Sequence, residues 1–418
     1  MTGQFGRRYH LRPMRCRVAL ILGAVGCLSL VTNRVPWLTV ACLSAAATLG
    51  IRAPRRLEVW VFAVWAWWAI AYFLTGESPG VLASFDFHRR DGQIFFSLLP
   101  AVAFAWLAPP ADRVGMGMAA FCALQAVVAL IGAVADLAGI RAALEGFVFL
   151  RDGERDLNYC GLYLAHNAAG SVQALCCLAA ATMAVFRQRT RERWVWGLLT
   201  VPLLWGVLLS GSRGSLLALA AAMGVLAVLA VRKRRLTRGA VVCSGLAVLL
   251  SAAAFGTSVR DRFAAFMHEE GTHTGRLEQW KRALREWSWS PVVGEGLGRY
   301  NDQDRQWSGV RHVYYVVTEA KVVNDAGHAH NSYVHFLAEG GLVGFGLTVG
   351  LWGWIGWNLR RSREPLRIAA FLGVLFLFLI SFTEHYMGGG AMLLVLSSLV
   401  GAAWNLPDEP APDRIAAA

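Results

Sequence analysis

The chain has 418 residues, of which 56% are hydrophobic and only 16% are charged, and its mean hydropathy is +0.45. A soluble fold of this length is not so apolar, so the composition predicts a protein with many membrane-spanning helices. The formal net charge of +13 could indicate a nucleic-acid partner, but that requires basic residues gathered on a soluble face. Here most of them punctuate apolar segments, so we attribute the charge to membrane topology and expect no nucleic-acid partner.

Apolar runs long enough to cross a bilayer, with tilt and short hairpins allowed, occur about twelve times. The expected spans are residues 18–32, 35–51, 57–75, 94–109, 114–140, 164–186, 195–210, 214–231, 239–256, 332–358, 368–384 and 388–405. We therefore expect an all-α, polytopic membrane protein with one large loop subdomain. Its parts are helices over 1–256, a loop with amphipathic helices over 257–331, helices over 332–405 and a disordered tail over 406–418.

The strongly basic short connections all fall on one side of the membrane if these spans alternate across it. Lys and Arg are enriched in cytoplasmic loops, so we expect both termini in the cytoplasm. The first apolar run ends in Val31-Thr32-Asn33-Arg34, which is not a signal-peptide cleavage site, so it is expected to stay as a helix. The large loop then faces the outer side.

The polar stretch His328–Tyr333 stands where the large loop meets the apolar segment 332–358. A histidine there could accept a proton near neutral pH, although histidines at helix entrances also commonly bond backbone groups. A zinc site formed by His328, His330 and His335 is a weaker alternative, because at 100° per residue His330 points away from the other two. Glu339 follows within the same span, where an ionisable group is a functional or partnered site by default.

Two arginines on the expected outer side are candidates for binding an anion. Arg276 falls inside the apolar arc of a helix over 276–287, and no acid within four residues shares its stripe. It therefore needs a membrane surface, a structural carboxylate or a bound anion as partner. Arg213 stands in the tight turn Ser210–Ser215, between glycines and hydroxyls that suit a close ligand, although the spacing alone slightly favours a hairpin whose arginine touches lipid headgroups.

Two guanidiniums and a histidine on one side suggest a polyanion held beside a proton acceptor. Nucleotide sugars are absent outside the inner membrane, so a transferase there needs a donor carried in lipid. A glycan on a polyprenyl pyrophosphate meets that need.

At these residues the sequence resembles the O-antigen ligase and polymerase superfamily, whose members span the membrane many times and carry one large periplasmic loop. The matching motifs are His330-Asn331-Ser332-Tyr333 through Glu339-Gly340, Ser210-Gly211-Ser212-Arg213-Gly214, Arg276-Leu277-Glu278-Gln279-Trp280 with Pro291 to Gly298, and more weakly His166-Asn167-Ala168-Ala169-Gly170. Each motif is loose alone, whereas their order, spacing and common side make the combination fairly specific.

The resemblance implies a GT-C-like, inverting glycosyltransferase of the bacterial inner membrane, acting without metal or cofactor at the periplasmic face. Its donor would be a glycan on undecaprenyl pyrophosphate and its acceptor the lipid A core. In this picture His330 is the base, and Arg213 and Arg276 hold the pyrophosphate. Substrate contacts are expected from Ser212, Asn331, Asn167, Tyr333, Arg151, Arg155, Arg89 and Arg90, with support from Glu339 and His328.

Three other functions stay open at this point. An O-antigen polymerase uses the same donor with a second lipid-linked glycan as acceptor, and a protein O-oligosaccharyltransferase uses a protein. A lipid or glycan transporter would predict charges and broken helices near the bilayer midplane, often in two related halves. No internal repeat is evident, so the transporter is the remote alternative.

Overall fold

The structure is a computed structural model that describes residues 56–74, 93–151, 157–163, 165–233, 270–297, 300, 315–318, 321–324 and 328–407. The predicted spans at 18–32, 35–51 and 239–256 lie outside the described residues, as does nearly all of the predicted tail. The total number of spans therefore stays a prediction.

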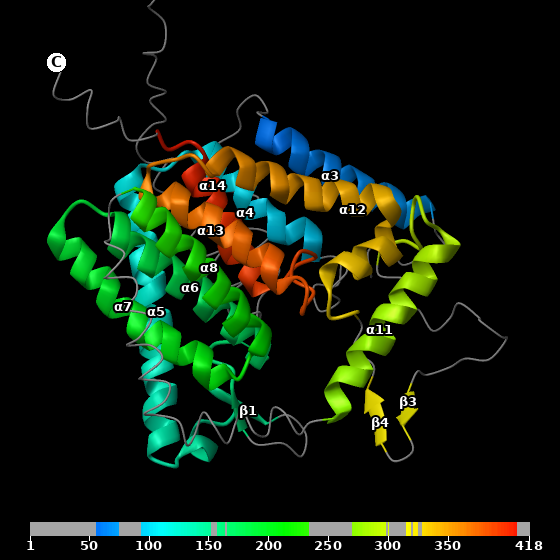
Figure 1. The fold of residues 1–418 in the computed structure, drawn as a ribbon, viewed down its shortest axis with the longest axis horizontal. Coiled ribbons are helices and arrows are strands. Elements are labelled where there is room, and N and C mark those ends of the chain that lie inside the picture. The colour runs from blue at the N-terminus through cyan, green and yellow to red at the C-terminus, as the bar shows by residue number, and fades with distance from the viewer. Residues whose placement is uncertain are drawn as a thin grey trace, which may run out of the picture.

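The described chain is a bundle of helices with two small hairpins at its edge (Figure 1). The helices are α3 (Arg56–Leu74), α4 (Gln93–Leu107), α5 (Ala111–Leu137), α6 (His166–Phe186), α7 (Thr190–Ser210), α8 (Arg213–Arg232), α11 (Glu270–Trp289), α12 (Ser332–Leu359), α13 (Pro365–Ile380) and α14 (Ala391–Trp404). Among the described residues, five of them (α5, α6, α7, α8 and α12) are long and apolar enough to cross a membrane. The predicted helical membrane protein is thus confirmed as a class.

Helix α6 lies at the centre of the bundle and packs against α5, α7, α8, α13 and α14. Its sequence is rich in alanine and in other small residues, which let neighbouring helix backbones approach closely. Gly170 is one such contact, because a Cβ there would overlap the side chains of Ser210 and Ser212. The helices at the periphery of the bundle instead expose large apolar side chains, such as Val134 on α5 and Leu198 on α7, which suits contact with lipid.

The contacts between α8 and α13 show which of the connecting segments lie at the same end of the bundle. Lys233, just after α8, donates from Nζ to the carbonyl of Ser362, just before α13, at 2.6 Å. At the opposite end Gly214, near the start of α8, packs so closely on Thr383 that a Cβ would overlap its hydroxyl. The two helices are therefore antiparallel, and the basic connections after α8 and before α13 share one end.

Helix α12 is broken, although the sequence predicted one continuous span over 332–358. Gly341 has φ 57° and ψ −164°, a backbone conformation that is almost confined to glycine. Segment 291–296 packs into the break and takes up the freed backbone groups. The bonds run from Glu295 N to Ala338 O (2.8 Å), Gly296 N to Glu339 O (2.9 Å), Leu342 N to Pro291 O (2.9 Å) and Val343 N to Val292 O (3.2 Å).

Two antiparallel hairpins and one short 3₁₀ turn were not expected from the sequence. They are β1 (Phe149–Arg151) with β2 (Leu157–Tyr159), β3 (Tyr315–Thr318) with β4 (Lys321–Asn324), and η2 (Arg141–Leu144). Valine, threonine and tyrosine favour a pleated strand, and strands this short leave little periodicity to detect. These short hairpins add to the all-α prediction without altering it, because the described chain is mostly helical.

Candidate active site

Helix α12 begins at Ser332 because Asn331 caps it. The Asn331 side-chain oxygen accepts hydrogen bonds from the amides of Tyr333 (2.9 Å) and Val334 (3.4 Å), which satisfies the first free donors of the helix. His330 precedes the cap with φ 47°, and its amide donates to His328 Nδ1 at 3.2 Å. The two histidines thus form a turn ahead of the helix, so a helical wheel drawn through them does not apply.

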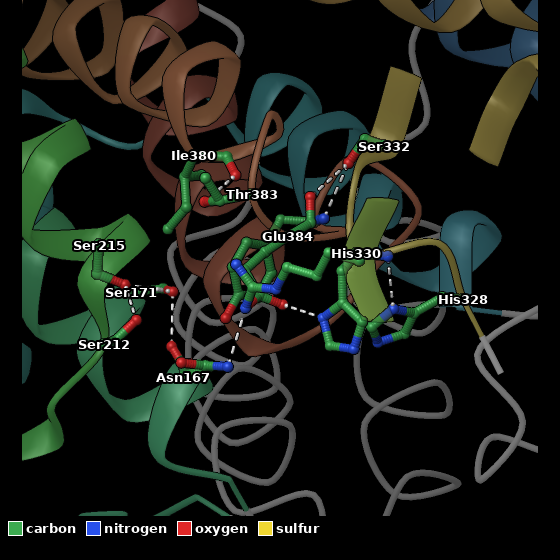
Figure 2. Close-up of polar contacts among 12 residues, drawn as sticks. Asn167, Ser171, Ser212, Ser215, His328, His330, Ser332, Ile380, Thr383 and Glu384 are labelled. Carbon is green, nitrogen blue, oxygen red and sulfur yellow. Dashed lines mark hydrogen bonds and ion pairs between the residues drawn. The ribbon is translucent and has the colours of Figure 1, made fainter. Parts of the chain in front are cut away.

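Three side chains converge on the carboxylate of Glu384 (Figure 2). His330 Nδ1 lies 3.1 Å from Oε2, while Arg276 Nη2 lies 3.2 Å from Oε1. Asn167 Nδ2 donates to the same Oε1 at 3.0 Å. These residues come from the turn before α12, from α11 and from the first turn of α6, so Glu384 joins three separate parts of the chain. Its side chain is only 8% exposed.

The backbone around Glu384 is fixed by Ser332, the first residue of α12. Ser332 Oγ donates to the carbonyl of Glu384 at 3.2 Å and accepts from the amides of Tyr386 (3.0 Å) and Met387 (3.2 Å). The Ser332 amide donates to the carbonyl of Ser381 at 2.9 Å. One serine therefore ties the connection between α13 and α14 to the start of α12, and this holds the carboxylate close to His330.

Arg276 has the partner that its position on the helix required. Of the partners left open, the structure places a carboxylate, Glu384, against it. The rest of the predicted apolar arc is only partly buried, since Ala283 is inside while Leu277 and Leu284 are exposed. Helix α11 instead buries Glu286, which Arg282 contacts at 3.0 Å, so a polar contact shares the packed face.

Arg213 is the first residue of α8 and is half-buried at the same end of the bundle as His330. Its neighbour Ser212 belongs to a line of buried hydroxyls, with Ser212 Oγ 2.8 Å from Ser215 Oγ and Ser215 Oγ 3.0 Å from Ser171 Oγ. Ser171 in turn donates to the carbonyl of Asn167 at 2.7 Å. Figure 2 shows this line leading to the amide that bonds Glu384. The arginine turn is thus built against the same cluster.

Glu339 belongs to a second buried pair rather than to the His330 turn. Its Oε2 lies 3.3 Å from His335 Nε2, and its Oε1 accepts from the amide of Tyr300 at 3.2 Å. The ring of His335 contacts that of His385 in a tilted arrangement, with centroids 3.9 Å apart, and His385 directly follows Glu384. The predicted supporting role of Glu339 can therefore reach the candidate site only through other side chains.

Of the other residues predicted to contact substrate, some bond to the protein itself and the rest lie outside the described residues. Tyr333 donates its hydroxyl to the carbonyl of Phe378 at 2.7 Å, and exposed Arg151 lies 3.6 Å from Glu145. Arg89, Arg90 and Arg155 lie outside the described residues. Within the described ranges, no three His, Cys, Asp or Glu side chains are grouped so as to hold a metal ion.

Sequence reasoning missed Glu384. The predicted span 368–384 placed it at the end of a helix, whereas α13 ends at Ile380 and Glu384 stands in the following connection. An acid at the end of an apolar run, followed by His385 and Tyr386, was the available signal, because an ionisable group there needs a partner or a function.

Comparison with known proteins agrees with the motifs. Residues 198–349 match the model of a family described as O-antigen ligase, and this segment contains Arg213, Arg276 and His330. The search of curated proteins found no significant match. The family match indicates a ligase or polymerase type of function, carried out by membrane enzymes that resemble glycosyltransferases. Over residues 198–349, as its motifs predicted, the chain is similar to the O-antigen ligase/polymerase family.

Proposed function

We propose that the protein is an O-antigen ligase, which transfers a glycan from undecaprenyl pyrophosphate to the lipid A core at the periplasmic face of the inner membrane. The observation that carries this proposal is the line His330–Glu384–Arg276, with contacts of 3.1 and 3.2 Å. His330 and Arg276 thus share one carboxylate, and an imidazole can accept a proton while a guanidinium can bind phosphate. The family match supports the choice of reaction class.

His330 is proposed as the base that takes the proton of the acceptor hydroxyl. In this role Glu384 is a carboxylate that accepts a hydrogen bond, and Nδ1, the imidazole nitrogen that faces it, is the donor. The other nitrogen, Nε2, then has the free lone pair that a base needs. Glu384 in this role selects the tautomer and stabilises the imidazolium that forms, as an acid behind a catalytic histidine does elsewhere.

The arginines are proposed to bind the leaving group. The acceptor oxygen forms a bond to the anomeric carbon while the bond from that carbon to the pyrophosphate oxygen breaks, and the leaving pyrophosphate keeps the electron pair. Guanidiniums at Arg213 and Arg276 would offset its growing charge through bidentate contacts. A single displacement inverts the anomeric centre and requires neither a covalent enzyme intermediate nor a metal.

The periplasmic assignment rests on charge. The candidate site lies at one end of the bundle, and the basic connections around Lys233 and Ser362 lie at the other. Short basic connections favour the cytoplasm, so the site end is assigned to the periplasm. A glycosyl donor there has to be lipid-linked, and this favours undecaprenyl pyrophosphate as the carrier.

Alanine variants of three residues test the assignment of the site. His330→Ala, Arg213→Ala and Arg276→Ala should each lower transfer by a factor on the order of 10² to 10³ while the protein still inserts and expresses. The measurement is glycan transfer by purified protein, normalised to the amount that elutes as a folded species. Near wild-type rates in all three variants would remove these residues from the site.

The acceptor is tested separately with the wild-type protein. A lipid-linked glycan is supplied with the lipid A core, with a second lipid-linked glycan or with an acceptor protein. We expect product on the lipid A core and expect a chelator to leave the rate unchanged. Product only on the second glycan would identify a polymerase, and product only on the protein an O-oligosaccharyltransferase.

A further inference from the structure

Glu384 carries one negative charge but faces two groups that can be cations. Arg276 and Asn167 both contact Oε1, at 3.2 and 3.0 Å, and His330 Nδ1 contacts Oε2 at 3.1 Å. While the guanidinium neutralises the carboxylate, less of that charge is available to an imidazolium on the other oxygen. The contact that orders Arg276 therefore weakens the support that Glu384 gives to His330.

The two partners of Glu384 differ in how firmly they are held. The side chain of Arg276 is 39% exposed and meets the carboxylate through one nitrogen and one oxygen, whereas Glu384 is 8% exposed. Ser332 bonds the carbonyl of Ser381 before Glu384 and the amide of Tyr386 after it, so the backbone that carries the carboxylate is fixed to the start of α12. Arg276 is thus the member of this line that can change partner while Glu384 and His330 stay in place.

We propose that the pyrophosphate of the donor competes with Glu384 for Arg276, and that this exchange leaves the charge of Glu384 to His330 alone. A pyrophosphate carries more negative charge than a carboxylate and offers a guanidinium two parallel contacts, so it is the stronger partner. The base is then supported in full only after the donor has bound. This inference rests on the proposed function, and it predicts that the donor binds before proton transfer begins.

Other charged and titratable groups near this line do not change the argument. The rings of His328 and His330 meet edge to face with centroids 4.1 Å apart, and the ring of His385 lies 6.0 Å from that of His328. Arg213 lies on the neighbouring helix end, where it is proposed to bind the same pyrophosphate. None of the contacts described for these three residues joins Arg276 to a second acid, so Glu384 remains its competitor for the donor.

The test is the variant Glu384→Gln, studied in the full-length protein. Its neutral amide no longer competes for Arg276, so inorganic pyrophosphate should bind about two- to fivefold more tightly than to wild type. The amide also cannot stabilise an imidazolium, so kcat for transfer should fall on the order of 10²-fold or more. Titration calorimetry measures the first quantity and transfer at saturating donor the second. Tighter binding with slower turnover is a split that a purely structural role does not produce.

Two further variants control the result. Glu339→Gln makes the same change in another buried acid, which pairs with His335 and has no described contact with Arg276, so it should not tighten pyrophosphate binding. Glu384→Asp keeps the charge but withdraws it by one methylene, so both measurements should fall between wild type and Glu384→Gln. If the glutamine variant does not fold, the aspartate variant still has to bind pyrophosphate more tightly and turn over more slowly than wild type.

The outcomes separate this inference from the proposed function. Unchanged or weaker pyrophosphate binding in the folded Glu384 variants, with an active wild type, would overturn the exchange and leave the proposed function standing. A wild type that neither binds pyrophosphate nor transfers glycan would overturn the proposed function, and the inference with it.

Discussion

Glu384 meets side chains that lie far from it in sequence: His330 is 54 residues away, Arg276 is 108 and Asn167 is 217. The helical wheel established that Arg276 needed a partner, because a guanidinium on a packed face is costly without one. It could not name the partner, because no local spacing connects these positions. At the scale of single residues, the sequence thus predicted that Arg276 has a partner, and the fold supplies Glu384 as that partner.

Glu286 supplies a pH test at this scale. Burial is the largest effect on its carboxyl and raises its pKa above the ordinary value of 4.5, against the opposing charge of Arg282. Between the ordinary pKa of 4.5 and the raised pKa of the folded state, the folded protein binds more protons than the unfolded protein. The free energy of unfolding therefore falls as pH rises through this window. Glu286→Gln cannot ionise and should be more stable than wild type above the window.

Thermal unfolding of both proteins, followed in detergent from about pH 4 to about pH 8, measures this difference. The gain in melting temperature should shrink towards acid pH and vanish where Glu286 is protonated in both states. A gap that stays constant with pH, or that widens towards acid, would contradict the assignment.

Cys160 supplies a second residue-scale prediction. Burial raises the pKa of its thiol from 9.0 to about 11, and Sγ lies 3.3 Å from the carbonyl of Val148. Only the thiolate reacts with alkylating agents, so two pKa units lower its reactive fraction about a hundredfold. Mass-spectrometric mapping should find Cys160 alkylated at neutral pH only after denaturation. Rapid labelling of the folded protein would show that β2 does not bury this thiol.

Helix α12 illustrates what changes at the scale of elements. Its apolar length predicted one continuous span, yet the chain breaks at Gly341, where segment 291–296 packs against it. This packing explains the glycine at position 294 in Gly294-Glu295-Gly296, because a Cβ there would overlap the backbone at Glu339 and Gly341. Close approach of two backbones therefore links the loop to the span that begins at the candidate site.

A matched pair of substitutions on α12 tests the break. Gly341→Ala forces a side chain into a conformation with φ 57° and into the backbone of Val292, so it should lower stability by about 2 kcal/mol or more. Gly350→Ala lies in open space on the same helix and should be neutral or stabilise by up to about 1 kcal/mol. Denaturant unfolding of both variants measures these changes. Equal stability of the two variants would remove the strain argument.

At the scale of the whole molecule, the bundle has two chemically different ends. Asn167, Gly214 and the His330 turn gather at the end that holds Glu384, and Lys233 stands at the other. The alternation of spans inferred from Lys and Arg counts agrees with this sorting, because antiparallel helices carry successive connections to opposite ends. The candidate site is thus separated from the basic connections by the length of the bundle.

Single cysteines in a chain whose native cysteines are replaced test this arrangement. Both test positions are exposed: Thr190, the first residue of α7, stands at the basic end, and Ala142, in η2, stands at the site end. Thr190→Cys should react with a membrane-impermeant maleimide only in inverted vesicles, and Ala142→Cys only in intact spheroplasts. Labelling of both positions from one side would contradict the topology.

The apolar composition and the spacing of hydrophobic runs determined the helical membrane class and the approximate position of each described span. The motifs around Arg213, Arg276 and His330 also predicted the resemblance to the O-antigen ligase family that residues 198–349 show. These properties are local, since each depends on residues that are close in sequence.

Only the tertiary structure decided that Glu384 joins His330 to Arg276, that Glu339 pairs with His335 and that α12 breaks at Gly341. Each of these depends on which distant segments pack together, and hydrophobic period does not encode that choice. A buried charge needs a partner wherever the fold can supply one, and here the connection between α13 and α14 supplies it.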